Sequence, residues 1–170
     1  APQKTWSLFE YPVQSFSVEM PAKPREKKDV VTEEGKIVYD WQAIDIKEQV
    51  FYGMSVSTMK EGMYDAGDDS SYFVAIKEKL KESFEEVAVL DSSFITVGTY
   101  PGYRLTVAGK TEGEQLETRI LAVSRGGISY YLYAVSGPGE NGKRTAERFL
   151  NSFKLLPFKY PEWKTVTAPD

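Results

Sequence analysis

Carboxylates gather in one stretch of the sequence, "DAGDD", which contains Asp65, Asp68 and Asp69. Such a loop could hold Ca²⁺, which takes about six to eight oxygen ligands, with Asp45 as a distant further carboxylate. The spacing differs from that of an EF-hand, and no Glu closes the loop. The other interpretation is the solvated start of a helix, where the helix dipole favours Asp. We predict an acidic helix start and keep a cation site as the alternative.

Aromatic side chains with polar tips offer a second chemistry. Tyr39 and Trp41 fall in one strand-like run, and Tyr130, Tyr131 and Tyr133 fall in another. Such residues can line a ligand cleft, because each combines an apolar ring with a hydrogen-bonding group. The same residues also favour strands and fill the faces of sheets. The ligand-binding hypothesis therefore names Trp41, Tyr131 and Tyr133, with sheet packing as the alternative.

Two arginines, Arg104 and Arg119, lie on neighbouring predicted strands, and Glu117 precedes the second of them by two residues. Together they could bind an anion as part of a ligand site. The alternative is a set of ion pairs on a solvated sheet face, which are common and contribute little to stability.

The residues that the chain lacks narrow its catalytic chemistry. The sequence contains no Cys and no His. Thiol nucleophiles, disulfides and thiolate metal sites are therefore excluded, and so is Ser-His-Asp catalysis. An enzyme would have to use carboxylates, Lys, Tyr, Ser or a metal bound by oxygen. No carboxylate pair stands out, and "GPGENGK" lacks the P-loop spacing. We expect no enzymatic activity and no cofactor; a small carboxylate-dependent hydrolase or lyase is the alternative.

Length and charge indicate one globular domain. The chain has 170 residues, of which 41% are hydrophobic and 27% charged, and its net charge is −4 with a pI of about 5.1. This balance argues against non-specific binding to nucleic acid, which needs a basic face. It also argues against a polybasic membrane-binding patch. No apolar run is long enough to span a bilayer.

Hydrophobic periodicity predicts eight or nine strands joined mostly by hairpins. Phe16, Val18 and Met20 alternate with polar residues, as in a strand with one buried face. Turns are expected at residues 34–35, 101–102, 112–113 and 126–127, where Gly follows Glu, Pro or another Gly. Strands in hairpin-linked runs favour an antiparallel sheet over β-α-β units.

Two helices are predicted. The first covers residues 70–87, starts at a cap formed by Asp69 or Ser70, and carries an apolar stripe from Phe73 to Val87. The second lies in "NGKRTAERFLNSFKLLPF", which begins at Asn141. Its stripe must dock on the sheet. The members of that stripe are Ala146, Phe149, Leu150 and Phe153.

The elements together predict an α+β fold, a mainly antiparallel β-sheet with helices packed on it. We assign residues 1–156 to a single domain and residues 157–170 to a C-terminal tail, which contains two further prolines after Pro157 and shows no period. The tail is expected to be extended against the body through Phe158, Tyr160 and Trp163, or partly disordered.

Three short stretches resemble a known family. They are "FSVEMPAKP" near the N-terminus, "YPGYRLTV" in the middle and "AERFLNSFKL" near the C-terminus. The chain is similar here to small exported bacterial proteins of the PsbP-like superfamily. The resemblance implies an α/β/α sandwich around an antiparallel sheet. It supplies no catalytic residues, and it implies a binding or assembly factor, as most family members are.

The functional expectation is a non-catalytic binding or assembly module of the bacterial cell envelope, in the periplasm or on the cell surface. Its partner is expected to be a protein or a small ligand, with no nucleic acid. The chain starts at Ala1 without Met, which fits a processed exported protein, including a lipoprotein whose lipidated Cys lies upstream, or a trimmed chain. A cation-binding protein that uses the acidic loop is a further alternative.

Overall fold

The computed structural model of the chain describes residues 6–31, 36–58 and 69–158. These residues form ten strands and two helices in two sheets. The strands are β1 (Ser7–Tyr11), β2 (Phe16–Met20), β3 (Arg25–Val31), β4 (Lys36–Asp45), β5 (Val50–Thr58), β6 (Glu85–Val97), β7 (Tyr100–Thr111), β8 (Glu114–Arg125), β9 (Ile128–Ser136) and β10 (Lys154–Leu155). The helices are α1 (Asp69–Glu82) and α2 (Glu140–Asn151).

All strand pairs are antiparallel. The large sheet has seven strands in the order β3-β4-β5-β9-β8-β7-β6, and the small sheet has three in the order β1-β2-β10. The predicted α+β class with a mainly antiparallel sheet is confirmed.

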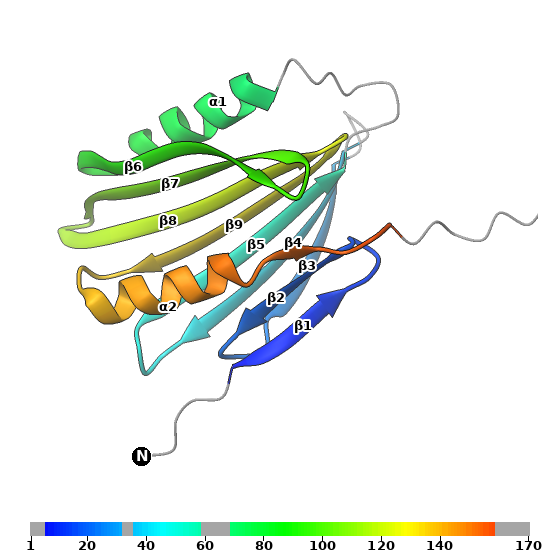
Figure 1. Cartoon of the computed structure of the whole chain (residues 1–170). Coiled ribbons are helices and arrows are strands. Elements are labelled where there is room, and N and C mark those ends of the chain that lie inside the picture. Colours follow the sequence, from blue (N-terminus) through cyan, green and yellow to red (C-terminus); the bar gives the residue numbers. More distant parts are fainter. Residues whose placement is uncertain (1–5, 32–35, 59–68, 159–170) are drawn as a thin grey trace, which may run out of the picture.

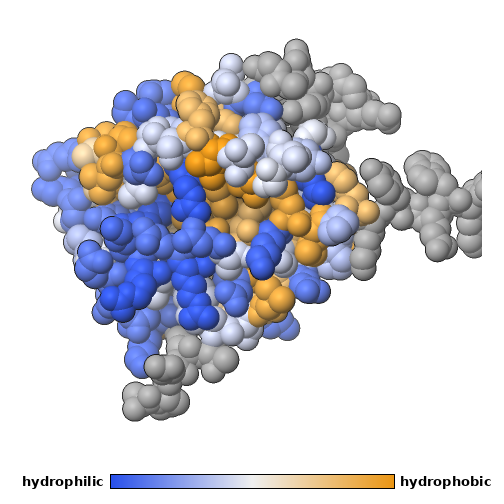
Figure 2. Space-filling model, in the orientation of Figure 1, coloured by the Kyte–Doolittle hydropathy of each residue, from blue (hydrophilic) through white to orange (hydrophobic). Residues whose placement is uncertain are grey.

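Helix α2 and the small sheet cover one face of the large sheet (Figure 1). The predicted stripe of α2 is buried, and Phe149 meets the ring of Tyr52 on β5 at 5.1 Å between centroids in a T-shaped contact. Alternate residues of β5 and β9, such as Tyr52 and Tyr130, point into this core because successive strand side chains face opposite sides. The outer side of α2 is hydrophilic, whereas hydrophobic side chains gather towards β6, β7 and β10 (Figure 2).

Helix α1 covers only part of the opposite face. It packs against β7 and β6, and its buried Phe73 stacks on Tyr103 of β7 at 5.7 Å between ring centroids. The large sheet therefore lies between two layers, as the resemblance implied. On the α1 side, however, β4 and β5 lie beyond the helix, so α1 leaves this half of the face uncovered (Figure 1).

Two of the predicted turns fall between paired strands. Glu112 and Gly113 join β7 to β8 with φ of 52° and 83°, and Gly126-Gly127 join β8 to β9. The prediction of a turn or kink at Pro101-Gly102 is wrong. The chain turns at Gly98, whose φ is 63°, and Pro101-Gly102 lies inside β7. Proline is tolerated there because Pro101 pairs only with Thr96 of β6, and the pairing of β7 with β8 begins at Gly102.

Helix α1 is shorter than predicted. It ends at Glu82, and β6 begins at Glu85, so residues 83–87 are not helical. Phe84 and Val87 nevertheless pack in the same core cluster as Phe73. Their helix-like spacing thus reflects a shared core and not a continuing helix.

The described C-terminal segment is tied to the body. The Leu156 amide donates to the Ser15 carbonyl at 2.8 Å, and Arg125 donates to the Leu156 carbonyl at 2.9 Å and stacks 3.7 Å from the Phe158 ring centroid. The expected contacts of Tyr160 and Trp163, and the turn at residues 34–35, lie outside the described residues. Neither described helix has the length and apolar character needed to cross a membrane.

Candidate functional site

A groove runs between α1 and the strand β9. It encloses about 350 Å³, and its walls come from the end of α1, from the β7–β8 hairpin and from β9. The residues that line it are mainly apolar or aromatic: Leu80, Ser83, Phe84, Thr111, Leu116, Thr118, Tyr131, Tyr133 and Val135. A neighbouring hollow of about 260 Å³ shares Leu80, Ser83 and Tyr131 and adds Ile76 and Lys79. The two hollows therefore extend along one side of α1.

Two tyrosines form the floor of this groove. Tyr131 and Tyr133 alternate along β9, and their ring centroids are 5.6 Å apart. Tyr133 also stacks on Phe51 of β5 at 6.0 Å. It can lie there because its strand neighbour is Gly53, where a Cβ would stand 2.0 Å from the Tyr133 Cζ.

The floor tyrosines are neutral hydroxyls at physiological pH. Burial raises the pKa of Tyr131, and the nearby Tyr72 and Tyr133 raise it further. Burial also raises the pKa of Tyr133; Gln42 opposes this through a hydrogen bond, and the charge of Asp40 adds to it. Each phenol can therefore donate and accept a hydrogen bond at the surface of an otherwise apolar groove.

One buried hydroxyl in the groove has no partner. Thr118 is 3% exposed, and its Oγ1 makes no hydrogen bond to any residue that the structure describes. A buried hydroxyl without a partner costs free energy, so this position favours a ligand or partner group that can hydrogen-bond.

The structure separates Trp41 from the two groove tyrosines. Trp41 is 2% exposed and lies on the other face of the large sheet, in the core with Phe16 and Tyr11. It packs under the small sheet. Of the three residues in the ligand-binding hypothesis, only Tyr131 and Tyr133 therefore line the groove beside α1.

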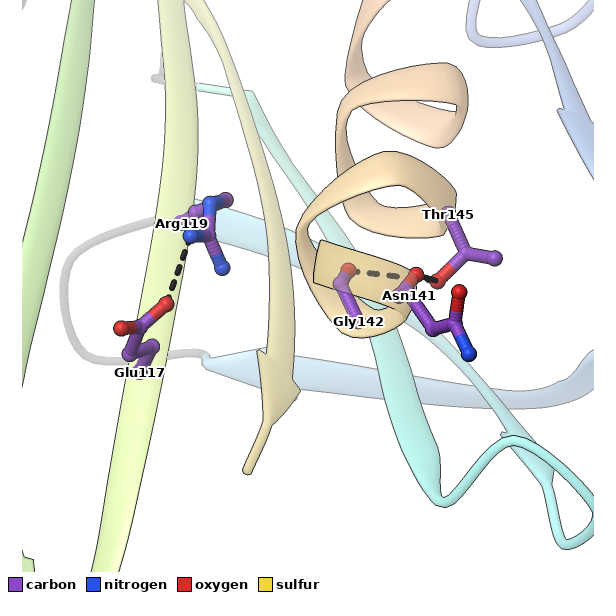
Figure 3. Close-up of polar contacts among 5 residues, drawn as sticks. All are labelled: Glu117, Arg119, Asn141, Gly142 and Thr145. Carbon is purple, nitrogen blue, oxygen red and sulfur yellow. Dashed lines mark hydrogen bonds and ion pairs between the residues drawn. The ribbon is translucent and has the colours of Figure 1, made fainter. Parts of the chain in front are cut away.

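The two arginines do not point to a shared ligand. Arg104 donates to the Asn151 side chain at the end of α2. Arg119, 6% exposed, pairs with Glu117 on its own strand, at 2.6 Å from Nη2 to Oε2 (Figure 3). Each arginine thus has its own partner, and both lie on the face that α2 covers.

Of the acidic cluster, the structure describes Asp69. It is the first residue of α1 and accepts a hydrogen bond of 2.6 Å from Ser124 Oγ. Asp65 and Asp68 lie outside the described residues. Asp45 lies at the end of β4, where its carboxylate accepts from the Glu48 amide at 3.1 Å. Within the described part of the chain, no three His, Cys, Asp or Glu residues group as metal ligands.

A separate hollow, of about 400 Å³, lies at the start of α2. Residues 47–49 line it on one side, and residues 136–142 line it on the other. Sequence reasoning tested "GPGENGK" only as a P-loop and missed this hollow. The one signal in the sequence is the lack of Ser, Thr, Asp or Asn directly before Glu140.

Known proteins match this chain in fold and not in sequence. No protein-family model matches the chain, and neither does any curated protein sequence. Among solved structures, the chain is similar to the cyanobacterial PsbP protein CyanoP from Synechocystis sp. PCC 6803, with 10% identity and a TM-score of 0.56. That match covers 91% of this chain and 95% of CyanoP.

Two further structures show weaker likeness. LpqN, involved in cell envelope biogenesis of Mycobacterium tuberculosis, is 12% identical over 92% of this chain and 87% of its own, with a TM-score of 0.47. The protein of unknown function PA94 from Pseudomonas aeruginosa is 13% identical over 78% of this chain and 83% of its own, with a TM-score of 0.44. The architecture defines an α+β sandwich of antiparallel strands. More narrowly, the chain has a PsbP-like fold.

Proposed function

We propose that this chain is a non-catalytic binding or assembly module of the bacterial cell envelope, and that it binds a protein partner through the groove beside α1. The observation that carries the proposal is the pairing of an aromatic floor, Tyr131 and Tyr133, with the unpartnered Thr118 hydroxyl. Tyrosine suits such a surface because it supplies a large rigid contact area together with a hydroxyl.

The surface around the groove favours a protein over a small enclosed ligand. Strand register places Ile44, Phe51, Val135 and Thr118 in one row across β4, β5, β9 and β8, on the same side as the groove. Ile44 is 59% exposed, so the apolar row continues from the groove out to solvent. We expect a partner that inserts one apolar side chain between α1 and the tyrosines and covers this row.

The lining of the groove sets this proposal apart from the alternative of a carboxylate-dependent hydrolase. The residues that line the two hollows beside α1 include no Asp and no Glu. A pair of carboxylates at this place would have to come from the partner. The placement in the envelope is supported by the PsbP-like fold. It is also supported by the three sequence stretches that resemble exported bacterial proteins.

The proposal is tested by a crosslinking pulldown from the native envelope with the whole chain as bait. We expect one stoichiometric partner, and we expect Tyr131→Ala together with Tyr133→Ala to remove it. A matched control changes exposed residues on the outer side of α2, such as Glu147→Ala. A partner that both variants retain equally would refute the role of the groove, and a folded, monomeric chain without any partner would refute the assembly function.

A further inference from the structure

The start of α2 has no side-chain cap. Its N-cap is Gly139, with φ of 140°, and no side chain caps the amides of the first turn by a hydrogen bond. The first bond of the helical ladder runs from the Lys143 amide to the Gly139 carbonyl at 3.2 Å. The amides of Glu140, Asn141 and Gly142 come before it and have no acceptor within the helix. All three residues line the hollow of about 400 Å³.

A buried hydroxyl lines the same hollow. Ser136 is 3% exposed, and its Oγ has no hydrogen-bond partner among the described residues. It lies directly against the first turn of α2, because a Cβ built on Gly142 would stand 2.6 Å from this oxygen. The absence of a side chain at Gly142 thus keeps the Ser136 hydroxyl next to the free amides.

The first turn is held in a fixed position. The Thr145 hydroxyl donates towards the carbonyls of Asn141 and Gly142 at 3.0 and 3.2 Å (Figure 3). The amides that begin the helix are therefore ordered before any ligand arrives, which lowers the entropy cost of binding.

The charged groups around the hollow are mostly engaged or solvated. Lys47 lies exposed at the rim, as do Glu48 and Glu140. The buried Asp45 carboxylate accepts from the Glu48 amide at 3.1 Å, and Glu117, opposite Ser136 on β8, pairs with Arg119 at 2.6 Å. The negative charges of Glu48 and Glu140 at the rim disfavour a bound anion. The backbone amides next to Ser136 at the first turn of α2 are hydrogen-bond donors and favour one.

We propose that the start of α2 is an oxyanion-binding site, which takes the phosphate or carboxylate end group of a ligand or partner. Helix N-termini favour anions because free amides and the helix dipole act together. The Ser136 hydroxyl supplies a further donor, and Lys47 supplies the positive charge at the rim. The volume falls in the range of about 300–1,000 Å³ that is usual for ligand pockets. This site lies away from the groove beside α1, so either can fail without the other.

The test is a titration of the full chain with inorganic phosphate, and in parallel with acetate, followed through backbone amide NMR shifts at constant ionic strength. We expect saturable shifts confined to residues 136–143 and 47–49. A tighter response to phosphate would assign a tetrahedral end group, and a tighter response to acetate a planar one. If neither anion shifts these amides while the chain stays folded, the proposal is overturned.

Two variants make the test specific. Ser136→Ala should weaken binding at least fivefold without unfolding the chain, because it removes a buried hydroxyl that has no partner in the free protein. Glu140→Gln should tighten binding severalfold, because it removes a negative charge from the rim. Equal affinity of the wild type and Ser136→Ala would contradict the site, and so would weaker binding by Glu140→Gln.

Discussion

Gly53 of β5 lies directly beneath the ring of Tyr133 on the neighbouring strand β9. A Cβ at position 53 would stand 2.0 Å from Cζ and 2.3 Å from the hydroxyl oxygen of Tyr133. The absence of a side chain at Gly53 therefore allows this ring to rest on the sheet and form the floor of the groove. The tyrosine contributes the contact surface, and the glycine on the next strand gives it room.

Gly53→Ala should displace the Tyr133 ring and break its stacking on Phe51. The new methyl group meets the far end of a side chain that can rotate away, so we expect a loss of only about 1–2 kcal/mol in the free energy of unfolding. A urea titration measures the stability, and near-UV circular dichroism reports the aromatic environment. Ser55→Ala, two residues along the same strand and face, is the control and should change stability by less than about 0.5 kcal/mol. An unchanged aromatic spectrum in Gly53→Ala would contradict the geometry.

Thr118→Val should stabilise the free protein. The substitution keeps the shape of the side chain and removes a buried hydroxyl without a partner, so the free energy of unfolding should rise by about 1 kcal/mol. The same change should weaken partner binding if this hydroxyl serves the groove. Differential scanning calorimetry measures the first effect and the pulldown the second. A destabilised Thr118→Val protein would show that the hydroxyl already has a structural partner.

Phe149→Ala should destabilise the protein by about 3–5 kcal/mol, because the ring is fully buried between α2 and β5 and its removal leaves a cavity. Denaturant titration provides the measurement. Arg144→Ala, on the exposed side of the same helix, is the matched control and should have little effect. A loss below about 1 kcal/mol for Phe149→Ala would show that α2 does not dock on the sheet as described.

Stability should fall in strongly alkaline solution. Burial and the charge of Glu26 raise the pKa of Tyr11 to about 12. Burial raises the pKa of Tyr52 to about 12 as well; the Thr145 hydroxyl opposes this, and the charges of Asp45 and Glu48 add to it. In the unfolded chain both phenols ionise near pH 10. Between these values the unfolded chain binds fewer protons than the folded one, so rising pH favours unfolding.

The contribution of these tyrosines to the free energy of unfolding should therefore be complete below pH 10. It should be lost as the pH rises through about 12. Urea titrations at a series of pH values, combined with tyrosinate absorbance of the folded protein, measure it. Tyr52→Phe removes one of the phenols with a raised pKa and should make the decline shallower. A stability that stays constant from pH 10 to 12 would contradict the burial of both phenols.

Strand faces and helix stripes could be predicted because they depend on local periodicity. The alternation of Tyr130 with Tyr131, and the stripe from Ala146 to Phe153, place these residues on the sides that the structure shows. The end of a helix was less predictable where the segment after it packs in the same hydrophobic cluster as the helix. Phe84 and Val87 continue the spacing of α1 only because they pack in the same cluster.

The sites were harder to predict, since they depend on which strands become neighbours. Tyr131 and Trp41 look alike in sequence, yet the register of β4, β5 and β9 places them on opposite faces of the sheet. The role of Gly53 beneath Tyr133 follows from a pair that is distant in sequence, and that of Ser136 beneath Gly142 follows from the way the chain turns back from β9 into α2. The Thr118 hydroxyl carries no signal in the sequence, because its lack of a partner becomes visible only once the surrounding elements are in place.

The most direct test of the account places a photo-crosslinking amino acid at position 133 in the groove and, as a control, at position 147 on the exposed side of α2. Irradiation is carried out in the intact producing cell. We expect one partner to be crosslinked from position 133 and not from position 147, and we expect Gly53→Ala to reduce the yield at position 133. Equal capture from both positions, or no capture from position 133 by a folded chain, would contradict a binding role for the groove.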